Sequence, residues 1–410
     1  MKRGLIGNPV RHSYSSQIHQ ELTKEGYELQ SLDEKEFDLW MKKADFEAIN
    51  ITAPYKEKVI LYCDEIMEEA RQIGAVNTIV KRAGKLVGYN TDFYGFEWLL
   101  KEVPCDLKIK KVCLLGDGGT AKTIKAVLDK KEIKYLQVSR KRTSGCISYE
   151  ELYENHLDCE VFIQSTSVGM FPQSDGKVVD LEKFKEAELV IDVIYNPKQT
   201  LLIQQARELG IKTIGGLGML VAQAKKAIEI FENKELSDDV IDDMIAKIEK
   251  EKENIVFIGM PGVGKTTIAK QVGELLNKKV ISIDEEIREK YDMLPAQIIL
   301  ERGEQAFRKL EEEVVLNNLD QHGVIFDCGG GIIVKKRVMQ LLRQHGKIVW
   351  IQQDLYRLPQ DESRPLSSSF DKIVELYEQR KALYKLYADI EIENNGELSD
   401  VVEIITNIIE

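Results

Sequence analysis

The amino-acid sequence predicts an α/β protein with mainly parallel sheets. Short apolar runs alternate with amphipathic helical stretches along the chain, which is the pattern of repeated strand–helix–strand units. Two glycine-rich segments support this class, because each follows an apolar run directly and opens a helical stretch. The helical stretches include residues 18–26 and 121–131. The runs expected as strands are 47–52, 111–116, 135–139, 161–166, 189–195, 255–259, 280–284, 323–327 and 347–353.

Length and composition limit the class of protein. The chain has 410 residues, which corresponds to two or three domains. Apolar residues make up 43% of the chain and charged residues 31%, so a disordered or collagen-like protein is excluded. The formal net charge of −12 argues against binding to a nucleic-acid backbone, which needs a positive surface. We therefore expect small-molecule partners.

The N-terminus and the cysteines favour a cytoplasmic protein. The start, MKRGLIGNP, turns polar after six residues and has no apolar stretch of signal-peptide length. No window approaches 18 uninterrupted apolar residues, so a membrane span is not expected. A chain of this length needs no disulfides, and we expect reduced thiols. The six cysteines form no CxxC pair and no metal-like cluster: Cys63, Cys105, Cys113, Cys146, Cys159 and Cys328.

A highly charged segment divides the chain. Residues 236–254 carry helical periodicity and end where a new apolar run begins, so we interpret residues 237–253 as a helical linker. Neither side of this segment is basic, which argues against a nucleic-acid-binding domain hidden in the average.

The first glycine-rich segment, GDGGTA at 116–121, has the pattern of a dinucleotide-binding turn. Gly116 would make the tight turn, Gly118 would let a pyrophosphate approach the backbone, and Ala121 would let helix and strand pack closely. Alone the pattern is weak, since such turns are also structural. An NAD enzyme would place an acidic residue after the next strand, but Ser139 is followed there by three basic residues, Arg140, Lys141 and Arg142. They suit a 2′-phosphate, so the sequence favours NADP over NAD.

Residues 1–236 resemble shikimate dehydrogenases. The resemblance is carried by ordered motifs: GNPVRHSYSSQIHQ (7–20), NITAPYK (50–56), GAVNT (74–78), GYNTDFYGF (88–96), QSTSVGM (164–170), DVIYNP (192–197) and GGLGMLVAQ (215–223). It implies a substrate-binding lobe from residues 1–100 and 217–236, with a Rossmann-type NADP lobe from 101–216 between them.

The resemblance also implies the roles of individual residues. Lys56 and Asp92 would form the catalytic pair, in which Lys56 protonates the developing alkoxide. Without the resemblance, Lys56 would be read as a surface lysine and Asp92 as a helix cap. The substrate would be bound by Ser13, Ser15, Thr52, Asn77, Asp92, Tyr195 and Gln223. The cofactor would be bound by Gly116, Gly118, Gly119, Ala121, Ser139, Arg140, Lys141, Arg142, Met170 and Gly216.

The second glycine-rich segment, GMPGVGKTT at 259–267, fits the phosphate-binding P-loop pattern. Backbone amides of such a loop surround phosphates, Lys265 would reach the terminal phosphates, and the Thr266 hydroxyl would bind Mg²⁺. Because the segment follows an apolar run and opens a helical stretch, it predicts an NTP-binding site.

Residues 254–410 resemble shikimate kinases, which implies a P-loop domain with a parallel sheet. The motifs are ISIDEEIREK (281–290), GEQAFRKLEEEV (303–314), DCGGG (327–331), SRPL (363–366) and YEQRKALY (377–384). Asp284 would orient or deprotonate the shikimate hydroxyl. Arg308 would clamp the carboxylate, although a helix ion pair with Glu304 or Glu312 is the plainer interpretation. Other substrate residues would be Gly330, Gly331 and Arg380, and ATP would be bound by Gly262, Gly264, Lys265, Thr266, Thr267 and Arg364.

One departure from the kinase pattern concerns the metal. The family usually shows D-x-D after the P-loop, with the first aspartate near Mg²⁺, whereas this chain has Ser282 and then Asp284. It also has Asp327 two residues before the triple glycine, where other P-loop enzymes place their Walker-B carboxylate. We hypothesise that Asp327 supplies the carboxylate that Ser282 lacks, with Thr266 as the second metal residue.

The two resemblances together predict a bifunctional enzyme. It would reduce 3-dehydroshikimate with NADPH and then phosphorylate shikimate with ATP and Mg²⁺. One alternative is a quinate/shikimate dehydrogenase of broader specificity fused to the kinase. The other is a metabolite-sensing regulator without catalysis, which the presence of Lys56, Asp92, Lys265, Asp284 and Arg308 argues against.

Overall fold

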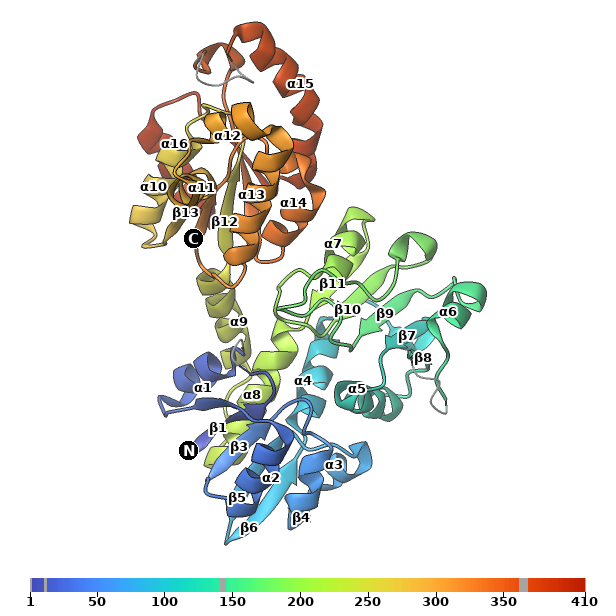
Figure 1. Cartoon of the computed structure of the whole chain (residues 1–410). Helices are drawn as coiled ribbons and strands as arrows, with labels where there is room; N and C mark the ends of the chain where they lie inside the picture. The colour runs from blue at the N-terminus through green and yellow to red at the C-terminus, as the bar shows by residue number, and fades with distance from the viewer. Residues whose placement is uncertain (1, 11–12, 141–144, 361–367, 410) are drawn as a thin grey trace. The chain divides into compact units, whose positions relative to one another are not determined.

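The computed structural model describes residues 2–10, 13–140, 145–360 and 368–409. The predicted site residues Lys141, Arg142 and Arg364 therefore lie outside the described residues. The chain forms two compact units, Met1–Ala246 and Lys247–Glu410, which are described separately (Figure 1). Among the described residues, no helix is long and apolar enough to cross a membrane.

The first unit begins with a six-stranded sheet in the order β2-β1-β3-β5-β6-β4. Strands β2, β1 and β3 are parallel, while β5 runs antiparallel to β3 and β6. The strands are β1 (Arg3–Gly7), β2 (Glu28–Ser31), β3 (Ala48–Ile51), β4 (Glu65–Ile66), β5 (Thr78–Arg82) and β6 (Lys85–Tyr89). The helices of this part are α1 (Ser15–Thr23), α2 (Glu34–Lys43), α3 (Glu68–Ile73) and α4 (Thr91–Leu99), with a 3₁₀ helix η1 (Lys58–Tyr62).

A second sheet in the same unit has five parallel strands in the order β11-β10-β9-β7-β8. Its strands are β7 (Val112–Leu115), β8 (Tyr135–Val138), β9 (Val161–Gln164), β10 (Leu189–Asp192) and β11 (Lys212–Gly215). The helices are α5 (Gly119–Lys130), α6 (Tyr149–Asn155), α7 (Leu201–Glu208) and α8 (Leu217–Glu232), with 3₁₀ helices η2 (Leu100–Glu102), η3 (Leu107–Ile109) and η4 (Leu181–Lys183).

Helices α4 and α8 connect the two sheets of the first unit. They pack closely on each other, α8 also contacts α1 and β5, and α4 contacts α5 (Figure 1). Gly218 is required at this crossing, because a Cβ there would lie 2.6 Å from the ring of Trp98. The chain thus returns after the second sheet to pack against the first.

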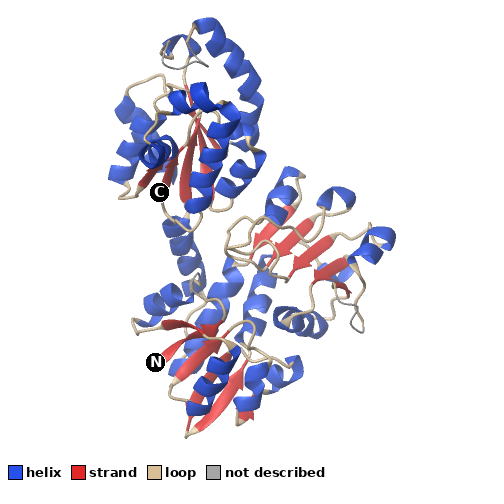
Figure 2. Ribbon diagram, viewed as in Figure 1, coloured by secondary structure: helices blue, strands red, loops and turns tan. Residues whose placement is uncertain are grey.

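The second unit is a five-stranded parallel sheet in the order β13-β14-β12-β15-β16, with helices around it (Figure 2). The strands are β12 (Asn254–Ile258), β13 (Val280–Ser282), β14 (Ile325–Asp327), β15 (Gly346–Gln352) and β16 (Ile390–Glu393). The helices are α10 (Lys265–Leu275), α11 (Ile283–Tyr291), α12 (Pro295–Arg302), α13 (Glu304–Asn317), α14 (Lys336–Arg343), α15 (Phe370–Tyr387) and α16 (Leu398–Ile409), with η5 (Ile332–Val334) and η6 (Leu355–Arg357). The α/β class predicted from the sequence is confirmed.

The predicted linker region is helical, as α9 (Asp239–Lys252). Its start is tied to the first unit through Asp238, whose carboxylate accepts hydrogen bonds from the Tyr94 hydroxyl at 2.7 Å and the Lys225 ammonium at 2.8 Å. These two bonds lower the pKa of Asp238 to about 2.

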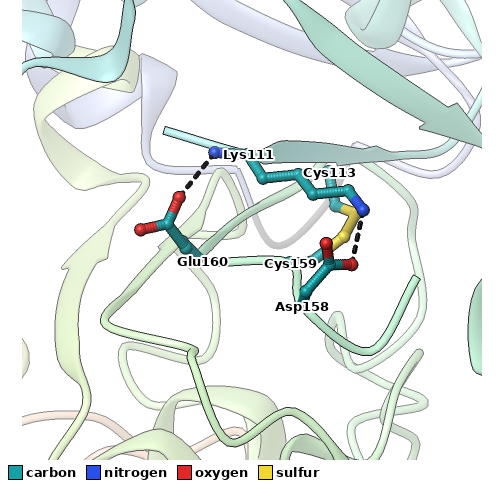
Figure 3. The surroundings of a disulfide bond; sticks show 5 residues. All are labelled: Lys111, Cys113, Asp158, Cys159 and Glu160. Atoms are coloured by element: carbon teal, nitrogen blue, oxygen red, sulfur yellow. Dashed lines mark hydrogen bonds and ion pairs between the residues drawn. A yellow bond between two sulfur atoms is a disulfide. The ribbon is translucent and has the colours of Figure 1, made fainter. Parts of the chain in front are cut away.

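A disulfide joins Cys113 and Cys159 (Figure 3). The expectation that all six thiols are reduced is therefore wrong for this pair. Cys113 lies on β7, Cys159 lies two residues before β9, and these strands are paired neighbours, so residues 46 apart in the chain come to a Cα–Cα distance of 6.4 Å. The two cysteines are brought together by the order of the strands in the sheet, which the spacing of cysteines in the sequence does not reveal. The other four cysteines, all among the described residues, form no disulfide.

We expect a buried histidine, His345, to make the folding stability of the second unit depend on pH. His345 lies next to β15, is 7% exposed, and packs against His322 with ring centroids 4.5 Å apart. Burial, together with His322, lowers the pKa of His345 to about 3. Because the unfolded chain binds this proton near pH 6.5, stability is fully present above that pH and is lost as the pH falls. At about pH 5 the loss from this one group is about 2 kcal/mol.

The test is urea unfolding at pH 5 and pH 7.5 in a Trp40→Phe/Trp98→Phe background, in which Trp350 of β15 is the remaining tryptophan. We expect His345→Phe to reduce the pH dependence of the unfolding free energy by about 2 kcal/mol. An equal pH dependence with and without His345 would show that another group is responsible. A probe in the second unit is needed because the first unit contains another buried histidine, His19, with a pKa of about 3. Trp350 lies in the second unit and therefore reports the unfolding of that unit.

Candidate functional site

The first unit contains a cavity of about 850 Å³. All the predicted dehydrogenase substrate residues line it, and so does Lys56. Of the predicted cofactor residues, Ala121 is fully buried and does not reach the cavity. The predicted residues on its wall are Ser13, Ser15, Thr52, Lys56, Asn77, Asp92, Gly116, Gly118, Gly119, Ser139, Arg140, Met170, Tyr195, Gly216 and Gln223.

Lys56 and Asp92 form an ion pair in this cavity. The Lys56 Nζ lies 2.7 Å from the Asp92 Oδ2, and the two side chains are 15% and 10% exposed. Lys56 follows the end of β3, while Asp92 lies in the first turn of α4, which Asn90 caps by accepting a hydrogen bond from the Phe93 amide. An ammonium group is thus paired with a carboxylate, and both side chains are mostly buried.

Two polar residues of the same wall, Asn77 and Gln223, are joined through the buried Thr91, which does not line the cavity. Asn77 Oδ1 accepts from the Thr91 amide at 2.7 Å, and the Thr91 hydroxyl donates to Gln223 Oε1 at 3.3 Å. Asn77 follows α3, Thr91 begins α4 and Gln223 lies on α8, so residues distant in sequence converge. Thr91 was not predicted. Its one sequence signal is its place beside Asp92.

The predicted carboxylate-binding serines lie beside Tyr195. The Ser13 hydroxyl donates to the Ser15 hydroxyl at 3.0 Å and accepts from the Ser15 amide at 3.2 Å. Between them in sequence, Tyr14 packs against Tyr195 with ring centroids 5.3 Å apart. The two hydroxyls therefore form a small polar group next to an aromatic wall.

The glycine turn after β7 fits a dinucleotide. Gly116 has φ +122° and packs against Ser165, where a Cβ would lie 2.6 Å from the hydroxyl oxygen. A Cβ at Gly118, the N-cap of α5, would meet no atom of the described residues within 4 Å, so these residues leave space over the helix N-terminus for phosphate groups. Gly119 lies against the Lys56 side chain, with its Cβ position 3.7 Å from Lys56 Cδ. The turn therefore adjoins the Lys56–Asp92 ion pair.

The second unit carries a P-loop between β12 and α10. Gly259, Gly262 and Gly264 have φ values of +150°, +82° and +91°, which side chains rarely adopt. Lys265 Nζ donates to the carbonyl oxygens of Gly259 at 3.1 Å and Met260 at 3.0 Å. The ammonium thus lies over the loop that would surround the phosphates.

Arg308 lies in a buried cluster of charges on α13. It is 5% exposed and pairs with Glu304 at 2.7 Å and with Glu311 at 2.6 Å. The helix ion pair with Glu304 is present, but the other partner is Glu311 and not Glu312. Burial raises the pKa of Glu311 to about 7, against the opposing effect of Arg308. Glu311 was not predicted, and its Oε1 has no hydrogen-bond partner among the described residues.

The triple glycine brings the P-loop, α11, α13 and α15 together. A Cβ at Gly329 would lie 2.8 Å from Glu311 Oε1 and 3.1 Å from Asp284 Oδ1, and one at Gly331 would overlap the Arg308 guanidinium at 1.9 Å. The Gly330 carbonyl accepts hydrogen bonds from Arg380 at 3.0 Å and Tyr384 at 2.7 Å. The predicted substrate residues Asp284, Arg308 and Arg380 therefore all lie around this segment.

The predicted metal residues are in contact. The Thr266 hydroxyl donates to Asp327 Oδ2 at 2.7 Å. Thr266 and Thr267 are exposed in the first turn of α10, and Gly262 and Gly264 lie in the loop before it. A residue that was not predicted, Asn394, donates from Nδ2 to the Val263 carbonyl at 2.8 Å. It joins the end of β16 to the P-loop.

Comparison with known proteins assigns both units. The family model of the shikimate dehydrogenase substrate-binding domain matches residues 5–79. A shikimate dehydrogenase (NADP⁺) of Clostridium perfringens is 36% identical over 252 residues, which cover 56% of this chain and 91% of the relative. The chain belongs to the shikimate dehydrogenase family. The shikimate kinase family model matches residues 261–410, so the second unit is a shikimate kinase domain. Joining the two makes the chain a bifunctional enzyme of the shikimate pathway.

Solved dehydrogenases share the fold of the first unit. The structure of shikimate dehydrogenase 1 from Peptoclostridium difficile has a TM-score of 0.57 and 32% identity, and the match covers 60% of this chain and 98% of that one. The enzyme from Thermus thermophilus, solved with NADP(H) and shikimate, has a TM-score of 0.54 and 25% identity over 60% of this chain and 99% of that one.

Proposed function

We propose that the first unit reduces 3-dehydroshikimate to shikimate with NADPH and that the second unit phosphorylates shikimate with MgATP. The main support for the dehydrogenase site is the Lys56–Asp92 ion pair. Its charged atoms are 2.7 Å apart, and both residues line the cavity that the dinucleotide turn also lines. The names and complexes of the relatives support NADP and shikimate as ligands.

In the first reaction, the side chains of the cavity bind and orient the substrate. Ser13 and Ser15 would accept its carboxylate, while Asn77, Thr52 and Gln223 would bind its hydroxyls. When bound, NADPH supplies the hydride. Lys56 would donate a proton to the oxygen that gains charge, and Asp92 would hold the ammonium charged and in place. Arg140, on the cavity wall, would bind the 2′-phosphate.

In the second reaction, Asp284 would accept or orient the proton of the attacking hydroxyl. Arg308 and Arg380 would bind the substrate carboxylate, because planar guanidinium groups suit carboxylates. Glu311 would hold Arg308 in its orientation through the 2.6 Å ion pair. Lys265 would stabilise the terminal phosphates from its place over the P-loop.

The experiment is a coupled assay on the intact chain. With 3-dehydroshikimate and NADPH we expect shikimate, and on addition of MgATP we expect shikimate 3-phosphate, both identified by mass spectrometry. A chain that makes neither product would be the metabolite-sensing regulator, and the proposal would be wrong. Equal oxidation rates with quinate and shikimate would instead identify a dehydrogenase of broader specificity.

A further inference from the structure

The end of β14 holds a buried carboxylate between two hydroxyl groups. Asp327 is 5% exposed, and its Oδ2 accepts hydrogen bonds from Thr266 at 2.7 Å and from Ser282 at 3.1 Å. The strand register explains the contact between Ser282 and Asp327, because Ser282 of β13 lies opposite Asp327 of β14. Thr266 reaches the same oxygen from the first turn of α10.

Among the described residues, the side chains that hydrogen-bond this carboxylate are uncharged. Among the described residues, no Lys, Arg or His lies within ion-pair distance of Asp327. Its partners are neutral hydroxyls, although a buried carboxylate normally has a cation beside it. Since one of these hydroxyls belongs to the P-loop helix, the balancing cation would lie next to the phosphates of a bound nucleotide.

We infer that Asp327 is the carboxylate that holds the magnesium ion of MgATP in this chain, at the position where related kinases use the residue that here is Ser282. The inference rests on the proposed kinase activity. Asp284 lies beside the triple glycine, since its Oδ1 is 3.1 Å from the position that a Cβ would take at Gly329. Ser282 and Asp327 have thus exchanged roles across one pair of neighbouring strands.

The chemistry of the site suits magnesium. The described residues contain no group of three or more His, Cys, Asp or Glu side chains placed to hold a metal. Magnesium in kinase sites needs no such cage, because it takes one or two carboxylates together with substrate phosphates and water. When bound, the ion neutralises charge on the phosphates. Asp327 would orient it directly or through water, and Thr266 would supply a hydroxyl oxygen.

The test measures metal binding without turnover. Mn²⁺ is titrated into the intact chain with a non-hydrolysable ATP analogue, and free Mn²⁺ is followed by electron paramagnetic resonance. We expect Asp327→Asn to weaken Mn²⁺ binding by about 10- to 100-fold. The double variant Ser282→Asp/Asp327→Asn, which restores the usual kinase arrangement, should recover most of the affinity. The matched control is Asp320→Asn, an exposed carboxylate beyond the other end of β14.

Each outcome is decisive. Unchanged Mn²⁺ affinity in Asp327→Asn overturns the inference, and loss without recovery in the double variant overturns the exchange with Ser282. Analogue binding in EDTA checks that the second unit is folded. If Asp327→Asn fails this check, Asp327→Glu, which keeps the charge but moves it, must still weaken Mn²⁺ binding. Failure of the wild-type chain to phosphorylate shikimate would refute the proposed kinase activity and leave the Mn²⁺ comparison interpretable.

Discussion

Replacing Lys56 by alanine should abolish reduction of 3-dehydroshikimate while leaving phosphorylation of added shikimate unchanged. Loss of a positioned proton donor costs about 10²- to 10⁴-fold in kcat. Asp92 would also lose its partner at 2.7 Å in a site where both side chains are mostly buried. NADPH oxidation gives kcat and KM for the first activity, and the kinase activity of the same sample reports the amount of intact protein.

The control for this variant is Lys58→Ala. Lys58 is two residues away and pairs with Glu34 and Asp38, but it is not on the cavity wall. Its removal should therefore leave the kcat of reduction close to wild type. If Lys56→Ala retains more than about a tenth of the wild-type kcat, Lys56 is not the proton donor. A rise in KM alone would assign Lys56 to substrate binding.

Replacing Lys265 by alanine should stop the coupled reaction at shikimate. Its ammonium is held over the P-loop by two carbonyl oxygens, where it would meet the terminal phosphates. Loss of one preorganised charge at a transferring phosphoryl group costs about 10²- to 10³-fold in kcat. Shikimate should accumulate at the wild-type rate, because the first unit is unaltered. Mass spectrometry of the product mixture over time measures both steps.

Lys270 provides the matched control, because it is an exposed lysine farther along the same helix, α10. Lys270→Ala should phosphorylate shikimate at nearly the wild-type rate. Wild-type phosphorylation by Lys265→Ala would contradict the assignment of the P-loop. If shikimate formation also fell in Lys265→Ala, the two activities would not be independent.

The buried strands of the sheets could be predicted from the sequence, because a strand that is buried on both faces is a run of apolar residues. Each of the nine predicted runs overlaps one strand: β3, β7, β8, β9, β10, β12, β13, β14 and β15. The strands that were not predicted are β1, β2, β4, β11, β16 and the antiparallel pair β5 and β6. The hairpin of β5 and β6 turns at Ala83 and Gly84, and β5 ends in the exposed residues Lys81 and Arg82, so the apolar pattern is short. Antiparallel pairing in the first sheet was therefore not predicted.

The site residues were predictable where they lie in motifs and not where only packing distinguishes them. Glu311 is the first of three consecutive glutamates, and sequence alone cannot rank them. In the structure the side chain of Glu311 is 1% exposed, against 20% for Glu312 and 43% for Glu313. Glu311 shares a helix face with Arg308, three residues earlier, whereas its neighbours turn toward solvent. Asn394 was also not predicted. Its hydrogen bond to the P-loop depends on the position at which β16 ends, which the sequence does not show.

The anchoring of Asp238 determines where the two activities can be separated by cutting the gene. A cut after residue 236, where the resemblance to shikimate dehydrogenases ends, would remove Asp238 from Tyr94 and Lys225. Lys225 is 4% exposed and would keep Glu229 as its buried acidic partner. Both α4, which carries Asp92, and α8, which carries Gln223, would lose this tie. A dehydrogenase prepared alone should therefore extend to residue 246, although the added residues contain no catalytic group.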